Sequence, residues 1–215
     1  MFDLDGVLVD SEIWWDEVRQ AFAASHGRSW TQADRSAVMG ANSAAWARIM
    51  RKRLGLAMPE HEIEDAIVSA MVQRYANEGA PVIDGAADAV RRIGALDRMA
   101  VASSAHRAVI DAALGATDLR EAFEVVVSSD EVAHGKPAPD VYLETAARLG
   151  VPPSDCLVVE DSLNGVKAAR AAGMTVVLIP NASVPPAPGT QELADLVLPR
   201  LADLDPDAVP RRVAT

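Results

Sequence analysis

The sequence predicts an α/β protein: a Rossmann-like parallel sheet covered by helices on both faces, with an all-α segment inserted after the first strand. From residue 81 onward, short runs of consecutive apolar residues alternate with helical patterns, as in parallel strands buried on both faces. Residues 12–78 instead repeat apolar side chains at helical spacing and show no strand-like alternation. We therefore expect a core domain of residues 1–10 and 81–215 and a helical domain of residues 11–80.

The first predicted strand ends within the opening residues. Met1 and Phe2 have the character of a buried strand end, and Gly6 breaks the extended run because glycine adopts conformations that other residues resist. Asp3 and Asp5 therefore fall where the strand turns into a loop. Only two residues precede Asp3, whereas a strand usually has about five or six, so we expect the sequence to begin inside this strand.

The inserted segment contains three apolar stripes at helical spacing. It also holds all four tryptophans of the chain, which favours a small helical core. Gly27, Gly55 and Gly79 stand where the predicted helices end. The stripes are formed by Trp14, Val18 and Phe22, by Trp46, Ile49, Met50 and Leu54, and by Ile63, Ile67, Met71 and Tyr75.

Strands and helices alternate along the rest of the chain. Each apolar run is short enough for a strand, and several helical patterns end at a glycine. The predicted strands are residues 99–102, 125–127, 156–159, 175–179 and 196–198, and the predicted helices are residues 84–93, 107–114, 138–149 and 162–172.

Composition narrows the classes of partner. The formal net charge of -11 at pH 7 argues against nucleic acid or an anionic membrane as the main partner. No apolar stretch is long enough to span a bilayer, and no signal peptide is evident. The single cysteine, Cys156, excludes an internal disulfide and fits a reducing compartment. We expect a cytoplasmic monomer that acts on a small molecule.

Polar residues gather where the predicted strands end. The carboxyl ends of parallel strands meet at one edge of the sheet, where open α/β sheets bind ligands. Each group alone also has a structural explanation, as a turn acid or a helix N-cap. Adjacent acids after an apolar strand are nevertheless costly unless a cation balances them. The groups are Asp3 with Asp5, Ser103 with Ser104, Lys136, and Glu160 with Asp161.

These four groups, in this order, resemble the four motifs of the haloacid dehalogenase-like superfamily of phosphatases and phosphomutases. The first is the string Asp-Leu-Asp-Gly-Val-Leu-Val-Asp-Ser that begins at Asp3. The third and fourth are Gly-Lys-Pro-Ala-Pro-Asp around Lys136 and Glu-Asp-Ser-Leu-Asn-Gly from Glu160. The helical insert resembles the α-helical cap domain of β-phosphoglucomutase-like members, so residues 11–80 are expected to be that cap.

The resemblance implies a role for each motif residue. Asp3 would be the nucleophile that forms an aspartyl phosphate, and Asp5 the general acid and base. Asp3, the backbone carbonyl of Asp5, Glu160 and Asp161 would hold Mg²⁺. Ser103, the Ser104 backbone amide and Lys136 would bind the phosphoryl oxygens.

Charge explains why such a set is needed. A carboxylate that approaches a phosphate dianion meets a repulsion of about 4 kcal/mol per like-charge pair at roughly 4 Å and an effective dielectric of about 20. A divalent cation and an ammonium group placed beside the transferred phosphoryl group offset this repulsion.

Two departures from the family's mutases favour hydrolysis of a small phosphomonoester. The mutases carry a cap histidine about a dozen residues after the nucleophile, where this sequence has Trp14 and Trp15. They also carry an arginine shortly after a cap glycine, whereas Gly40 is followed by Ala41, Asn42 and Ser43. Asp5 itself argues against the dehalogenases, which lack this second acid.

Two alternatives remain: a β-phosphoglucomutase-like sugar phosphate mutase, and a catalytically silent binding protein on the same fold. The identity of the ester is not determined by the sequence. The candidates for contact with its organic part are Trp14, Trp15, Met39, Gly40, Ala41 and Asn42.

Overall fold

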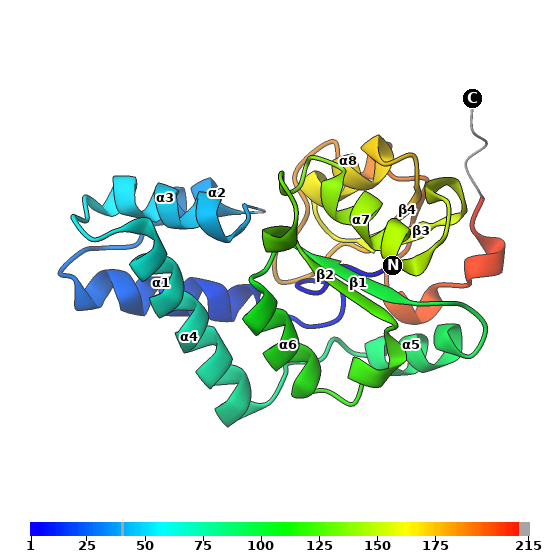
Figure 1. The fold of residues 1–215 in the computed structure, drawn as a ribbon, viewed down its shortest axis with the longest axis horizontal. Coiled ribbons are helices and arrows are strands. Elements are labelled where there is room, and N and C mark those ends of the chain that lie inside the picture. The colour runs from blue at the N-terminus through cyan, green and yellow to red at the C-terminus, as the bar shows by residue number, and fades with distance from the viewer. Residues whose placement is uncertain (40, 211–215) are drawn as a thin grey trace.

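The computed structural model describes residues 1–39 and 41–210. An α/β part and a group of four helices lie side by side along the long axis of the molecule (Figure 1). This arrangement confirms the predicted fold class. No helix among the described residues is long and apolar enough to cross a membrane.

All strand pairings in the sheet are parallel. β1 pairs with β2, and β4 lies between β3 and β5. The strands are β1 (Ala100–Ser103), β2 (Val125–Ser128), β3 (Leu157–Glu160), β4 (Thr175–Leu178) and β5 (Leu196–Val197).

Phe2 joins the two halves of the sheet. It forms parallel bridges to Val101 of β1 and to Val159 of β3. Its backbone N–H donates to the Ala100 carbonyl at 2.9 Å, and the Asp3 N–H donates to the Val159 carbonyl at 3.0 Å. The sheet order is therefore β2, β1, the Phe2 segment, β3, β4 and β5, with the first residues of the chain at its centre.

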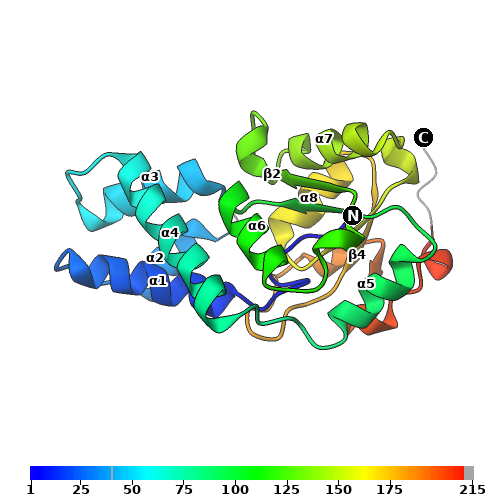
Figure 2. The ribbon, with the colours of Figure 1, turned by 60° about the horizontal axis from the view of Figure 1, so that its bottom comes forward.

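Four helices cover the two faces of this sheet. Alternate strand residues point to opposite faces, so Val101 and Val159 pack with α5 and α6 whereas Ala100 and Val158 pack with α7 and α8. Figure 2 brings the face with α5 and α6 forward. The helices are α5 (Ala86–Gly94), α6 (Arg107–Gly115), α7 (Asp140–Leu149) and α8 (Leu163–Ala171).

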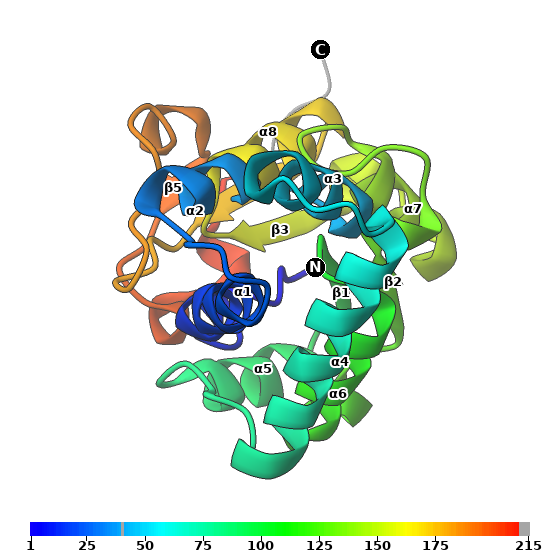
Figure 3. The same cartoon turned by 90° about the vertical axis from the view of Figure 1, so that its left-hand side faces the viewer.

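The helices of the insert pack on one another around buried Trp46, Met50, Ile63 and Met71. α4 also packs against α6 of the α/β part, and the view from the helical side shows α1–α4 in front of the sheet (Figure 3). The four helices are α1 (Glu12–Ser25), α2 (Gln32–Val38), α3 (Ser43–Leu54) and α4 (Glu60–Glu78).

The two chain segments that connect the insert to the sheet run side by side. The Asp10 N–H donates to the Pro81 carbonyl at 2.8 Å, and the Ile83 N–H donates to the Leu8 carbonyl at 3.0 Å. Leaving and returning at one place lets the helical group sit over the carboxyl end of the first strand.

The strands and helices predicted from residue 84 onward are all present, with ends shifted by a few residues. The helix predicted to start at residue 138 starts at Asp140, with Pro139 as its N-cap residue. β3 extends one residue further than expected and includes Glu160, whose side chain is fully buried. The strand that was predicted to end at Phe2 is reduced to bridges at that residue.

We predict that Phe2→Ala lowers the free energy of unfolding by about 3 to 5 kcal/mol, the usual effect of emptying a buried aromatic site. Phe2 is 2% exposed and packs edge-on against Phe123, with 5.9 Å between ring centroids. Urea unfolding followed by circular dichroism measures the change. Leu96→Ala is the control, because Leu96 is 78% exposed; equal effects of the two substitutions would contradict the central role of Phe2.

Candidate active site

The site lies at the carboxyl edge of the three central strands. Asp3 follows the Phe2 segment, Ser103 ends β1 and Glu160 ends β3. Because the Phe2 segment runs between β1 and β3, these three side chains come from neighbouring strand ends. Lys136 reaches the same edge from the loop between β2 and α7.

Lys136 is the buried cation of this cluster. Its ammonium Nζ donates to Asp3 Oδ1 at 2.9 Å, to Glu160 Oε1 at 2.7 Å and to the Ala102 carbonyl at 3.1 Å. Burial alone would lower the pKa of Lys136, but the charges of Asp3 and Glu160 outweigh burial and hold it well above its ordinary value. The side chain is therefore a fixed positive charge.

Glu160 is completely buried and both of its carboxylate oxygens accept hydrogen bonds. Oε1 accepts from the lysine ammonium and from the Tyr142 hydroxyl at 2.9 Å. Oε2 accepts from the backbone N–H groups of Asp161 and Ser162, both at 2.9 Å, and from the Ser162 hydroxyl. Burial opposes ionisation, but these donors outweigh it and lower the pKa of Glu160.

Gly165 leaves the space that Glu160 fills. A Cβ at that position would lie 1.6 Å from Glu160 Oε1. The Gly of the fourth motif string is therefore a packing requirement of the buried carboxylate.

Asp161 has the opposite environment. Its side chain is buried, yet among residues 1–39 and 41–210 no donor hydrogen-bonds its carboxylate. The carboxylate lies against Gly6, where a Cβ would come within 2.1 Å of Oδ2 and where φ is +82°. Burial and the charges of Glu160 and Asp3 raise the pKa of Asp161 well above its ordinary value. Such a carboxyl group is stabilised either by a proton or by a bound cation.

Asp3 completes the acidic group. Burial raises the pKa of Asp3 to about 7; the Lys136 charge opposes this shift, and Glu160 adds to it. Asp3, Glu160 and Asp161 each offer a carboxylate oxygen, and these oxygens all lie within 4.8 Å of one another. Hard carboxylate oxygens are the ligands that Mg²⁺ prefers, so this donor set fits the ion.

A cavity of about 640 Å³ opens above these carboxylates. Ser103 and Ser104, the predicted phosphate-binding residues, line it beside Lys136. Asp5 also lines it, and its Oδ1 accepts hydrogen bonds from the Ser11 hydroxyl and from Trp15 Nε1, the latter at 3.0 Å. All of the predicted motif residues therefore lie in or directly beneath one cavity.

The predicted cap contacts divide into two sets. Trp15, Met39 and Ala41 line the cavity. Trp14 does not, because its ring packs on Tyr75, with 5.2 Å between ring centroids, on another face of α1.

Asn42 does not line the cavity. The side chain of Asn42 accepts from the Ala45 N–H at 3.1 Å at the start of α3 and packs against the backbone of Gly135. Gly40 lies outside the described residues.

Sequence reasoning missed three residues of the site. Nothing in the sequence pointed to Tyr142, because a tyrosine within an apolar helix is normally a residue of the hydrophobic core. Glu12 and Arg19 line the cavity from α1, and their spacing to Trp15, three and four residues, could have placed them on its helix face. Burial and the Asp5 charge raise the pKa of Glu12 to about 7.

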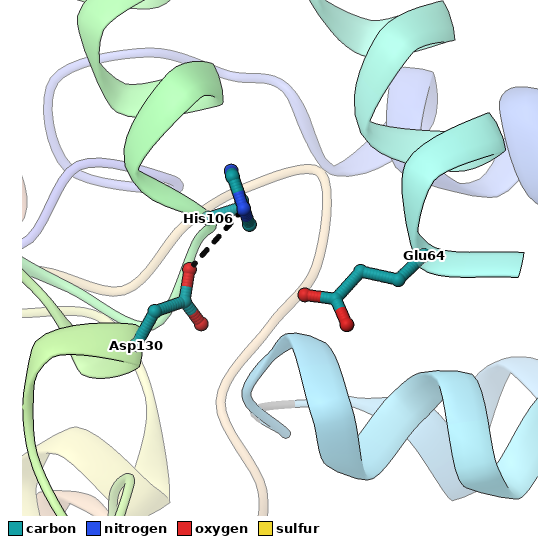
Figure 4. Close-up of side chains that lie close together, drawn as sticks. All are labelled: Glu64, His106 and Asp130. Atoms are coloured by element: carbon teal, nitrogen blue, oxygen red, sulfur yellow. Dashed lines mark ion pairs between the residues drawn. The ribbon is translucent and has the colours of Figure 1, made fainter. Parts of the chain in front are cut away.

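A second cluster of metal-type side chains lies where α4 meets the start of α6 (Figure 4). It consists of Glu64, His106 and Asp130, with 3.9 Å between His106 Nε2 and Asp130 Oδ2. His106 Nδ1 accepts from the Ala108 N–H at 3.1 Å, so the ring proton is on Nε2. A metal-bound histidine donates from its other nitrogen instead. The cluster is therefore a polar contact between the insert and the α/β part.

The fold and the site together define an α/β protein with a buried ammonium group among carboxylates at the carboxyl edge of its parallel sheet, beside an inserted group of helices. The sequence model of the haloacid dehalogenase-like hydrolase family matches residues 1–173, and the chain belongs to this family. The resemblance inferred from the motif strings is thus confirmed.

The relatives extend this assignment. Protein CbbY of Rhodobacter capsulatus is 37% identical over 195 residues, which cover 84% of each chain. Hexitol phosphatase B of Escherichia coli (strain K12) is 31% identical over 214 residues, 95% of this chain and 92% of that one. The bifunctional riboflavin kinase/FMN phosphatase of Arabidopsis thaliana is a longer protein that is 29% identical over 216 residues. The match covers 95% of the present chain and 53% of the Arabidopsis protein. Relatives named as phosphatases confirm the predicted enzyme class.

Among solved structures, a mutant of CbbY from Rhodobacter sphaeroides in complex with xylulose-(1,5)bisphosphate superposes with a TM-score of 0.81. The two chains are 26% identical, and 94% of each is covered.

We predict that Gly6→Ala displaces Asp161 and weakens Mg²⁺ binding by at least about tenfold, since a Cβ cannot share the space of the carboxylate. Gly150→Ala is the matched control. Gly150 also has a left-handed backbone, with φ +67°, but a Cβ there would meet nothing within 4 Å. Both substitutions destabilise the fold by about 1 to 2 kcal/mol, because alanine resists a left-handed backbone. Isothermal titration with Mg²⁺ separates them; equal affinities would contradict the placement of Asp161.

Proposed function

We propose that the protein is a Mg²⁺-dependent phosphatase that hydrolyses a small phosphomonoester through an aspartyl phosphate on Asp3. The observation that supports this proposal most strongly is that two buried carboxylates, Asp3 and Asp161, lie close together in different environments. Asp3 is held at one oxygen by Lys136, and Asp161 is buried without a donor among the described residues. A bound divalent cation would balance both and would polarise the phosphoryl group.

Asp3 is the nucleophile in this proposal. Lys136 occupies Oδ1, which leaves Oδ2 free to attack the phosphorus of the ester. The attack breaks the bond from phosphorus to the leaving oxygen and forms an acyl phosphate, and a water molecule then attacks the same phosphorus and releases phosphate. Each displacement is easier than direct hydrolysis because the carboxylate is already held in place.

Asp5 transfers the protons of the two steps. Its Oδ1 is fixed by the Trp15 indole and the Ser11 hydroxyl, so Oδ2 is the atom that protonates the leaving alkoxide and later takes a proton from water. Trp15 occupies the region where the family's mutases have a histidine. An indole N–H donates a hydrogen bond but, unlike an imidazole, cannot accept a proton, which favours hydrolysis over mutase chemistry.

Lys136, Ser103 and Ser104 bind the non-bridging oxygens of the phosphoryl group. Ser103 Oγ accepts a hydrogen bond from the Ala105 N–H at 3.1 Å. This leaves the serine hydroxyl proton available to donate to a phosphoryl oxygen. Glu160 would be the remaining metal ligand. Because both of its oxygens already accept hydrogen bonds, its main contribution is to hold Lys136 and the Asp161 backbone in place.

We also propose that residues 11–80 are a cap domain on the core of residues 1–10 and 81–215. The paired segments at Asp10 and Pro81 are its only covalent connections. Closure of the cap would exclude bulk water from the acyl phosphate and leave room for a small leaving group. The named activities of relatives, such as hexitol phosphatase, support a sugar or polyol phosphate. The acidic net charge of -11 supports a protein that works without nucleic acid, and we propose a cytoplasmic monomer.

A panel of metabolite phosphates tests the proposed function. We expect Mg²⁺-dependent release of phosphate from p-nitrophenyl phosphate and faster release from one small ester. The panel includes β-glucose 1-phosphate with a bisphosphate primer; formation of glucose 6-phosphate without net phosphate release would establish the mutase instead. Binding of esters without turnover would establish a silent binding protein.

We predict that Asp3→Asn lowers kcat by about a thousandfold or more, because an amide cannot form the acyl phosphate. Circular dichroism should show a folded protein. Asp97→Asn is the control, since Asp97 is exposed and distant from the cavity lining. Wild-type turnover by the Asp3→Asn protein would refute the role of Asp3 as nucleophile.

A further inference from the structure

Arg19 is a buried guanidinium without a partner in the wall of the cavity. The residue is 9% exposed and lines the cavity from α1. Its Nε is buried and has no hydrogen-bond partner, and among residues 1–39 and 41–210 the guanidinium forms no ion pair. The catalytic scheme proposed above does not use it.

Aromatic rings hold this guanidinium in place. Its central carbon lies 4.9 Å from the ring centroid of Trp15 and 5.4 Å from that of Trp46. Cation–π contact stabilises the charge but leaves the N–H donors unsatisfied. Burial lowers the pKa of Arg19 to about 10, so the group is still cationic at neutral pH.

The nearby aspartates are committed to other partners. Asp5 Oδ1 accepts from Trp15 and Ser11. Asp16 accepts from Trp30 Nε1 at 3.0 Å and from Arg35 Nε at 2.7 Å. Neither Asp5 nor Asp16 is hydrogen-bonded to the guanidinium of Arg19.

Glu12 is the acceptor that matches this donor. It lies seven residues, about two helical turns, before Arg19 on α1 and lines the same cavity. Within the described part of the chain its carboxylate has neither a hydrogen bond nor an ion pair. One side of the cavity therefore presents a donor and an acceptor that no hydrogen bond satisfies, on a single helix face. Their charges attract each other without direct contact.

We propose that Arg19 and Glu12 bind hydroxyl groups of the leaving group, so that the substrate is the phosphate monoester of a neutral polyhydroxylated carbon chain. This inference rests on the proposed phosphatase function. A hydroxyl group can accept from the guanidinium and donate to the carboxylate at once. A second phosphate or carboxylate on the substrate would gain Arg19 but would be repelled by Glu12 on the same helix face. Asp16 also lines the cavity, but its charge is balanced by Arg35.

The test compares two esters within each protein preparation: a hexitol 6-phosphate and hexyl phosphate, which has the same chain length and no hydroxyl groups. We expect the ratio of their kcat/KM values to fall by about tenfold to a hundredfold in Arg19→Met, the effect of losing a hydrogen bond to a charged group. Glu12→Gln should lower the same ratio less, because the amide oxygen still accepts. Since both esters meet the same enzyme molecules, a misfolded fraction cancels from the ratio.

Arg48→Met is the matched control, because Arg48 on α3 is exposed and its Nε lies 3.4 Å from Glu60; its ratio should equal that of the wild type. Arg19→Lys keeps the charge without the planar group and should also lower the ratio, which decides the matter if Arg19→Met does not fold. An unchanged ratio in the folded Arg19 variants would overturn the inference.

A third ester, a hexose 1,6-bisphosphate, tests the charge of the leaving group. We expect the wild type to prefer the hexitol monophosphate. A preference for the bisphosphate that disappears in Arg19→Met would overturn the neutral leaving group and assign Arg19 to a second phosphate. Hydrolysis of p-nitrophenyl phosphate but of none of these esters by the wild type would overturn the inference. Release of phosphate from neither these esters nor p-nitrophenyl phosphate would instead refute the phosphatase function itself.

Discussion

The ammonium group of Lys136, buried between Asp3 and Glu160, is the interaction on which the site depends. Through it, the loop after β2 is tied to the first strand, to β3 and to the Ala102 carbonyl of β1. Removal of one partner from a buried ion pair typically costs about 3 to 5 kcal/mol, because the other charge stays buried. The same contacts thus stabilise the centre of the sheet and fix the orientation of the nucleophile.

One ammonium group does not balance the acids around it. Burial raises the pKa of Asp3 to about 7 and raises the pKa of Asp161 well above its ordinary value. Without a metal, the folded protein therefore holds protons that the unfolded chain releases above a pKa of about 4. Stability of the metal-free protein falls as pH rises from about 4 to 7, because the unfolded state binds fewer protons in that range. A divalent cation takes the place of those protons, which couples metal binding to proton release.

Much of the site followed from the sequence, because parallel topology brings strand ends to one edge. Asp3, Ser103, Glu160 and Asp161 were expected together for this reason, and the coordinates place them together. The family and the fold class were equally accessible, since the motif strings and the alternation of apolar runs are local features of the sequence.

The helical insert was less predictable. Helical spacing shows which residues share a face, but it does not show whether that face meets another helix or the cavity. Trp14 and Trp15 were therefore equal candidates, and only packing against Tyr75 separates them. The hydrogen bond from Tyr142 to Glu160 depends on how α7 packs over the sheet, which no local pattern encodes.

The central claim is that Asp3 attacks phosphorus while Lys136 and a divalent cation balance the charge. The most direct measurement is to quench the enzyme in acid during turnover with Mg²⁺ and a phosphate ester, and to locate the phosphoryl group by peptide mass spectrometry. Our account predicts a phosphoryl group on the peptide that contains Asp3, lost on treatment with hydroxylamine and missing in Asp3→Asn. Turnover without phosphorylation of Asp3, or with phosphorylation of another residue, would contradict it.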